Sequence, residues 1–262
     1  MSKHQKHQHG TFSWTDLSTS DVAGAKKFYG ALFGWTWNDL PMGPGMTYTM
    51  CKLGADDAAA MSELGAEQKK MGIPPHWQVY FTVENVDEAT KRVAAAGGRV
   101  MVGPMDVMDA GRMTVAADPT GAVFALWQAM KHPGATVKGE NGAICWGEVL
   151  TSDPVAAGKF YADVLGWKLD AMDTPGMHYT VFKAGTEGTA GMMKKPDMMK
   201  DVPSCWMTYF LVASCDATVA KASELGGRVL VPPMDIPDVG RFATLMDPQG
   251  AAFSILQPPP AK

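Results

Sequence analysis

The feature that most constrains the fold of this chain is an internal duplication. The segment from Trp14 to Trp35 reads WTDLSTSDVAGAKKFYGALFGW, and it aligns without a gap with WGEVLTSDPVAAGKFYADVLGW from Trp146 to Trp167. Both copies continue through a GGRV sequence and end in an Asp-Pro-x-Gly sequence. A repeat of this length marks a structural unit. We therefore predict a disordered tail at 1–10, a first domain at 11–129, a linker at 130–141 and a second domain at 142–258.

Each copy divides again into two smaller units. A tryptophan opens a strand-like run at four places, namely Trp14, Trp77, Trp146 and Trp206. In the first unit Asp21 supplies helix-start chemistry, apolar residues recur at helical spacing, and Gly34 ends the helix before further short strands. A single helix cannot cover the sheet of one βαβββ unit, so two units must pair and curl around a shared cavity. We predict an α+β fold in which four βαβββ modules pair into two open-barrel domains, each with one cavity.

Composition indicates the kind of partner. A net charge of −4 provides no basic surface for nucleic acid or anionic lipid. No apolar stretch approaches the roughly 20 residues needed to cross a bilayer, and the first residues lack the apolar core of a signal peptide. We therefore predict a cytoplasmic protein, monomeric or homodimeric, with a small-molecule ligand and no nucleic-acid or membrane partner.

The cysteines and the N-terminal histidines do not predict a metal site. Four cysteines form no C-x-x-C pair and occupy unmatched places in the two copies, which favours reduced thiols over a disulfide framework or a zinc site. His4, His7 and His9 lie in a polar segment, and we expect a disordered appendage there. The twenty methionines would suit adaptable apolar pockets, but an organism's composition explains them equally well, and we assign them no role.

Three motifs connect both copies to a known family. A strand followed by S-D-x-x-x-A-x-x-F-Y-x-x-x-x-G-W, then G-G-R-V and D-P-x-G-x-x-F, resembles the vicinal oxygen chelate superfamily. That superfamily includes glyoxalase I, extradiol dioxygenases, and fosfomycin and bleomycin resistance proteins. In its tandem form the chain is similar to two-domain actinobacterial proteins labelled glyoxalase-like or hydroxylase, including a mycobacterial secreted-antigen type. The resemblance covers nearly the whole chain and implies the fold given above, while the reaction stays open.

Enzymes of that superfamily hold a divalent metal with His and Glu side chains from the first strand of each module and from the last strand. In the first copy these positions fall on residues that are poor ligands: Trp14, Gln78 and Ala125. In the second copy they fall on Trp146, Met207 and Ser254. We therefore predict no cofactor. The alternative is a divalent metal that uses His76, two residues from Gln78, because a one-residue error of register would move every side chain of a strand to the opposite face.

Both copies also contain a tryptophan followed two residues later by an acid. Strand alternation places Trp14 and Asp16 on one face, and Trp146 and Glu148 likewise. An indole can stack on a planar or cationic ligand, while a buried acid can accept hydrogen bonds or act as a general base. Alternatively, each tryptophan fills the barrel and each acid pairs with an arginine. The ligand-binding candidates are Trp14, Asp16, Tyr48, Trp77, Arg112, Trp127, Trp146, Glu148, His178, Tyr179, Trp206 and Arg241.

Three functions remain open on these grounds. We favour a metal-independent protein of the glyoxalase and bleomycin-resistance type that binds a small organic molecule in aromatic cavities. The second is an active lyase, isomerase or dioxygenase-like hydroxylase with Asp16, Glu148 and His76 as catalytic candidates. The third is a role in protein interaction or stress signalling, for which the duplication provides a rigid body.

Overall fold

Two curled sheets dominate the computed structural model, which describes residues 6–174 and 177–260. The first sheet contains β1 (Phe12–Thr19), β2 (Thr36–Gly43), β3 (Met46–Leu53), β4 (Asp56–Glu63), β5 (His76–Thr82), β6 (Arg99–Val107), β7 (Gly111–Ala117) and β8 (Val123–Ala129). The second contains β9 (Ile144–Thr151), β10 (Lys168–Thr174), β11 (Met177–Ala184), β12 (Glu187–Lys194), β13 (Cys205–Leu211), β14 (Arg228–Ile236), β15 (Gly240–Met246) and β16 (Ala252–Gln257). The helices are α1 (Val22–Phe33), α2 (Ala66–Lys70), α3 (Val86–Ala95), α4 (Pro154–Leu165), α5 (Cys215–Glu224) and the short 3₁₀ helix η1 (Asp197–Met199). None of the described helices is long and apolar enough to span a membrane.

The order of the elements confirms the predicted α+β fold of four βαβββ modules paired into two open barrels. The strand order in the first sheet is β2-β3-β4-β1-β5-β8-β7-β6, and the second sheet repeats it with β10-β11-β12-β9-β13-β16-β15-β14. The first strands of two modules pair antiparallel at the centre of each sheet, β1 with β5 and β9 with β13. A side chain on a central strand therefore faces residues of both modules.

Local sequence signals set the ends of the helices. The Asp21 carboxylate accepts a hydrogen bond from the Gly24 N–H at 2.9 Å. Helix α1 ends at Gly34, whose φ of 72° is the left-handed conformation that glycine adopts most easily. Helix α4 repeats this pattern with Asp153 before it and Gly166 after it. The predicted start and end of the first helix are thus confirmed.

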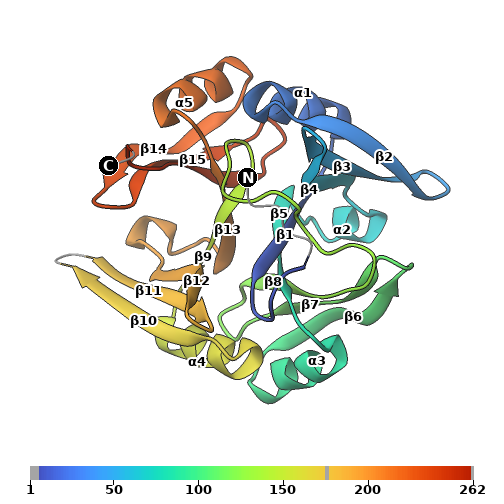
Figure 1. The fold of residues 1–262 in the computed structure, drawn as a ribbon, viewed down its shortest axis with the longest axis vertical. Coiled ribbons are helices and arrows are strands. Elements are labelled where there is room, and N and C mark those ends of the chain that lie inside the picture. Colours follow the sequence, from blue (N-terminus) through green and yellow to red (C-terminus); the bar gives the residue numbers. More distant parts are fainter. Residues whose placement is uncertain (1–5, 175–176, 261–262) are drawn as a thin grey trace.

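The two sheets pack through one shared aromatic core. The ring of Tyr29 on α1 lies 5.3 Å from Trp77 in its own half and 5.4 Å from Phe253 in the other half. Phe210 of the second half contacts both Phe33 and Trp77 of the first. Figure 1 shows α1 beside α5 at one side of the molecule and α3 beside α4 at the other. Because one face of each sheet is buried in this core, strand alternation leaves the opposite face to line a cavity.

Two hydrogen bonds between tyrosine and aspartate join the halves crosswise. Tyr29 Oη donates to Asp247 Oδ2 at 2.9 Å, and Tyr161 Oη donates to Asp118 Oδ2 at 3.0 Å. The other oxygen of each aspartate accepts backbone N–H groups of its own Asp-Pro-x-Gly turn. Each tyrosine oxygen also accepts an indole N–H from a buried tryptophan, Trp77 in the first half and Trp206 in the second. The repeated F-Y and D-P-x-G motifs therefore bind each other across the interface.

The segment that precedes the first strand belongs to the same interface. His7 is buried, and the Trp167 indole N–H of the second half donates to Gly10 O at 2.8 Å. The described part of the expected disordered tail is thus ordered, because its backbone pairs with the other half of the molecule. Residues 1–5, with His4, lie outside the described residues.

Removal of one crosswise hydroxyl tests the importance of this interface. Tyr161→Phe keeps the ring but leaves Asp118 Oδ2 and Trp206 Nε1 without their buried partner. We expect the free energy of unfolding to fall by about 1–3 kcal/mol, the usual cost of such unsatisfied groups. Urea denaturation followed by circular dichroism measures it, and the equivalent variant Tyr29→Phe should lose a similar amount. Unchanged stability in both variants would contradict this role.

Candidate functional site

On the cavity side of the first sheet, two tyrosines hold one carboxylate. Trp14 and Asp16 lie on β1, opposite Tyr80 and Gln78 of β5. Tyr48 on β3 and Tyr80 each donate a hydrogen bond to Asp16 Oδ2 at 2.9 Å, and Trp14 Nε1 donates to the Tyr48 oxygen at 3.0 Å. The second carboxylate oxygen, Oδ1, accepts no hydrogen bond from any residue that the structure describes. That oxygen is left for a ligand.

Burial changes the acidity of these groups. Loss of hydration raises the pKa of Asp16 above its ordinary value, although the hydrogen bonds from Tyr48 and Tyr80 and the charge of His76 act in the opposite direction. Burial, and then the nearby Asp16 charge, raises the pKa of both tyrosines, which therefore remain protonated donors at neutral pH. A carboxyl group with a raised pKa can take a proton from a bound molecule and return it, which general acid–base chemistry requires.

These groups line a cavity of about 220 Å³ in the first half. Most of its wall is apolar and comes from both modules. Indoles and thioethers contribute much of that wall: Trp14, Trp127, Met42, Met50, Met108 and Met113. Four of the twenty methionines, to which the sequence assigned no role, thus surround the buried acid.

The second half repeats the constellation with a longer acid. Trp146 Nε1 donates to Tyr179 Oη at 2.8 Å, and Tyr209 Oη donates to Glu148 Oε1 at 3.0 Å. Tyr179 also hydrogen-bonds Glu148, and burial raises the pKa of this carboxyl group. The structure thus brings together the predicted residues Trp146, Glu148 and Tyr179, as it does Trp14, Asp16 and Tyr48 in the first half.

A glycine makes room for the extra methylene of Glu148. The neighbour of Glu148 on the parallel strand is Gly191, whereas the neighbour of Asp16 is Ala60. A Cβ on Gly191 would lie 1.8 Å from Tyr179 Oη. Any larger residue at this position would therefore push the tyrosine hydroxyl out of its place. The shorter acid, Asp16, therefore has an alanine beside it, and the longer acid, Glu148, has a glycine.

Two residues of the first cavity have no equivalent in the second half. Trp127 aligns with Leu256, and His132 belongs to the segment predicted as the linker. The Trp127 indole N–H donates to His132 O at 2.9 Å, and the rings of His132 and Trp14 meet edge to face with centroids 4.6 Å apart. Burial lowers the pKa of His132, so its imidazole is neutral at physiological pH.

Four other candidates lie away from this cavity. Trp77 and Trp206 are buried between the halves, where each donates to the tyrosine of a neighbouring helix. His76 is half-buried at the start of β5, with Nδ1 2.9 Å from Pro74 O, and it does not line the described cavity. His178 is exposed on β11.

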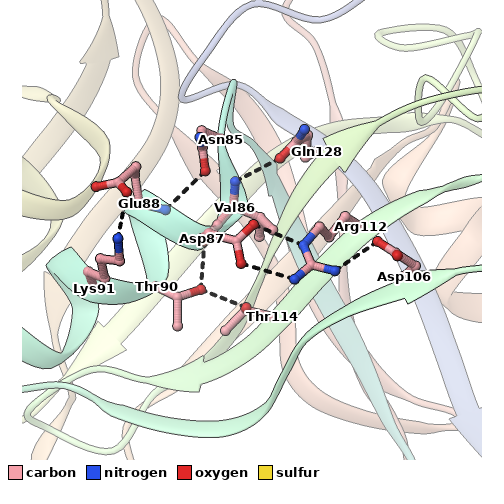
Figure 2. A network of polar contacts seen from close by, with 10 residues as sticks. All are labelled: Asn85, Val86, Asp87, Glu88, Thr90, Lys91, Asp106, Arg112, Thr114 and Gln128. Atoms are coloured by element: carbon pink, nitrogen blue, oxygen red, sulfur yellow. Dashed lines mark hydrogen bonds and ion pairs between the residues drawn. The ribbon is translucent and has the colours of Figure 1, made fainter.

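The two arginines do not pair with the buried acids. Figure 2 shows Arg112 bound to Asp87 of α3, at 2.9 Å, and to Asp106 of β6, at 2.8 Å. Arg241 makes the equivalent bonds to acids of α5 and β14 in the second half, Asp216 and Asp235. Each arginine therefore ties a helix to the adjacent β-hairpin on the outer side of its half.

The side chains present do not fit the metal site that the fold family implies. At the corresponding positions Trp14 donates to a tyrosine, the Gln78 amide donates to a backbone carbonyl, and Ala125 has no ligating atom. Within residues 6–174 and 177–260, no three His, Cys, Asp or Glu side chains gather closely enough to hold a metal ion. No step through a metal follows from this arrangement.

Two half-barrels of paired βαβββ modules, each with a buried acid on its central strand, define a tandem repeat of one α+β architecture. The chain belongs to the Glyoxalase/Bleomycin resistance protein/Dioxygenase superfamily, whose family model matches residues 11–126 and 146–255. The family resemblance read from the sequence motifs is thus confirmed.

Relatives align along almost the entire chain. The chain is 45% identical over 264 residues to CFP32 of Mycobacterium tuberculosis, with 99% of each chain covered. CFP32 carries the provisional name of a glyoxylase. It is 38% identical to the anthracycline biosynthesis protein DnrV of Streptomyces peucetius, with 95% of this chain and 93% of that protein covered.

Solved structures share the fold at low sequence identity. The 2,3-dioxygenase LapB of Pseudomonas sp. KL28 superposes with a TM-score of 0.66 at 14% identity, with 97% of this chain and 96% of that chain covered. The Mn(II)-bound glyoxalase of Novosphingobium aromaticivorans gives a TM-score of 0.65 at 13% identity, with 95% and 82% covered. At such identities the comparison establishes the architecture, and the chemistry must come from the site itself.

Three polar residues of the two constellations escaped the sequence reasoning. Tyr80 and Tyr209 lie two positions beyond Gln78 and Met207 on the same strands, so alternation from those positions would have found them. His132 gave no such signal, because it lies between the copies and no repeat partner marks it.

The match between acid length and strand neighbour predicts the effect of Gly191→Ala. The new methyl group would displace the Tyr179 hydroxyl from Glu148, and we expect a loss of about 1–3 kcal/mol in the free energy of unfolding. The double variant Gly191→Ala with Glu148→Asp, which installs the pair of the first half, should recover part of that loss in urea denaturation. Wild-type stability of the single variant would refute the steric argument.

The pKa of Asp16 predicts a pH dependence of stability. Because folding raises this pKa, the contribution of Asp16 to stability falls as pH rises from the ordinary aspartate range through the folded-state pKa. Asp16→Asn should therefore be more thermostable than wild type at pH 7, and its advantage should shrink on acidification. Thermal unfolding measured between pH 4 and pH 8 checks this.

An exposed acid provides a control of opposite sign. Its hydrogen bonds to Arg112 lower the pKa of Asp87, so its contribution is present at neutral pH and is lost as pH falls. Asp87→Asn should be less stable than wild type at pH 7, with a deficit that disappears in acid. The same sign of pH dependence in both variants would contradict the assignment.

Proposed function

We propose that this protein binds a small, planar and largely apolar organic molecule in the cavity of its first half, without the metal of its superfamily. The observation that carries the proposal is the unbonded oxygen of Asp16, a buried acid in the wall of an otherwise mainly apolar cavity. Ligand pockets in general combine apolar walls with a few placed polar groups.

The walls favour a flat ligand. Trp14 and Trp127 offer indole surfaces for stacking, and the methionine thioethers adapt to the edges of a ring system. The volume of about 220 Å³ exceeds the roughly 150 Å³ of an engineered apolar cavity that binds benzene. A molecule with two fused rings is therefore a suitable first probe.

The acid favours a ligand with a hydrogen-bond donor. Tyr48 and Tyr80 occupy Asp16 Oδ2, so a ligand hydroxyl or amine would bond to Oδ1. A hydrogen bond to a charged group contributes about 1.5–3 kcal/mol. The burial of the Asp16 carboxylate lowers the stability of the fold, but the same carboxylate would contribute to ligand affinity. Functional sites commonly lower stability in this way.

One relative supports the same class of ligand. DnrV is named for anthracycline biosynthesis and is 38% identical over 258 residues. Anthracyclines are fused-ring aromatic compounds that carry hydroxyl groups, and these are the two properties that the walls and the acid of the first cavity favour.

We keep the cytoplasm as the proposed location. All four cysteines are free thiols, which is usual for a protein of a reducing compartment.

Isothermal titration with a matched pair of compounds tests the binding site. 1-Naphthol and 1-methoxynaphthalene share a ring system, but only the first can donate a hydrogen bond to Asp16. We expect the naphthol to bind wild type about tenfold more tightly. Asp16→Asn, whose amide oxygen can still accept from the tyrosines, should abolish this preference.

The second half supplies the matched control. Glu148→Gln changes the equivalent acid and should leave both affinities unaltered if the ligand occupies the first cavity. Equal affinity of wild type for the two compounds would remove Asp16 as the anchor, and the absence of binding by either compound would overturn the proposal.

A further inference from the structure

The segment between the two halves completes the first cavity with a polar side chain. The His132 N–H donates to Ala110 O of the β6–β7 turn at 3.0 Å, and the Ala135 N–H donates to Ser13 O of β1 at 2.8 Å. Between them Gly134 has a φ of 105°, and a Cβ there would lie 2.6 Å from Ser13 O. The chain is therefore held closely against two elements that also line the cavity, and His132 is fixed between these contacts.

The imidazole of His132 is held in place but is not satisfied. Its ring packs edge to face on Trp14, and its backbone oxygen accepts the Trp127 indole N–H. The Nε2 atom is buried, and no group of the described residues forms a hydrogen bond with it. Buried polar atoms nearly always have a partner in folded proteins. Because the His132 side chain lines the cavity, a molecule that enters it can offer the imidazole a partner.

The charges around the ring leave it neutral. Burial is the main cause of its lowered pKa, while Asp57 raises the pKa and Lys52 lowers it. These two residues form an ion pair with each other, and Asp16 accepts hydrogen bonds from tyrosines. A neutral imidazole has one N–H donor and one acceptor nitrogen, so it can bind either a hydroxyl or a carbonyl oxygen.

The second half shows that this group is not a requirement of the fold. Both halves keep the tryptophan, the acid and the two tyrosines, yet the second half has Leu256 in place of Trp127 and continues after Gln257 into Pro258 and Pro259. A residue needed to build the half-barrel would recur in both copies. His132 therefore distinguishes the first half from the second.

We propose that His132 determines the specificity of the first cavity by forming the second hydrogen bond to a ligand whose hydroxyl group is bound by Asp16. This inference rests on the function proposed above and narrows it. The ligand is a planar fused-ring aromatic compound with two polar substituents, a hydroxyl group and a second hydroxyl or carbonyl oxygen.

Calorimetric titration with 1-naphthol and the isomeric naphthalenediols tests the proposal. At least one diol should bind wild type about tenfold more tightly than 1-naphthol, because it satisfies both polar groups. His132→Phe keeps a ring against Trp14 and should abolish this gain while 1-naphthol affinity changes less than about threefold. His132→Gln, which retains a polar side chain, should restore part of the gain.

Trp127→Leu serves as the matched control, since it introduces the residue of the second half. It removes stacking surface and should weaken 1-naphthol and the diols equally. If His132→Phe does not fold, the ring nitrogen resonances of His132 in wild type decide instead: they should shift with the diol and not with 1-naphthol.

The outcomes separate the two proposals. A diol gain that persists without the imidazole, the absence of any diol gain in wild type, or identical resonance shifts with both compounds overturns the role of His132 while the Asp16 site stands. Failure of 1-naphthol to bind wild type removes both proposals.

Discussion

The crosswise hydrogen bonds of Tyr29 to Asp247 and of Tyr161 to Asp118 are the constraint on which the rest of the structure depends. They consist of the motifs that mark the repeat, so each copy of a motif is completed only by the other half. The aromatic residues around them form one core rather than two. Separation of the halves would expose that core and leave buried aspartates and indoles unpaired, so both sheets are expected to unfold together. The interface also decides which face of each sheet is free to line a cavity.

Within each half, the antiparallel pairing of two central strands makes a buried acid tolerable. It brings an acid from one module beside a tyrosine from the other, Asp16 with Tyr80 and Glu148 with Tyr209. A lone carboxylate in an apolar wall would be strongly unfavourable, and two phenolic donors offset part of that cost. The remaining cost appears as a raised pKa. The second half has the longer acid and a glycine, Gly191, where the first half has Ala60, and this combination keeps the tyrosine in contact.

The sequence predicted what depends on local pattern and failed where tertiary contacts decide. The position of Trp14 and Asp16 on one face follows from the two-residue period of a strand, and the end of the first helix follows from Gly34. Trp77 opens its strand as Trp14 does, yet it lies opposite Leu17 and faces the core. A shift of one residue along a strand moves a side chain to the opposite face. A strand that is buried on both faces shows no polar alternation that would reveal this shift. The order of the segment around Gly10 depends on Trp167 in the other half, which no local pattern records.

The two halves differ in the polar groups that surround the buried acid. In the second half Ser254 lies opposite Tyr209 on the neighbouring strand, where the first half has Ala125 opposite Tyr80. In the first half Asp16 Oδ1 and His132 Nε2 have no protein partner among the described residues. A duplication creates a connecting segment that belongs to neither copy, and such a segment can change without disturbing the motifs that hold the halves together. His132 lies in that segment, so it adds a polar side chain to the wall of the first cavity while the motifs of the shared core stay the same in both copies.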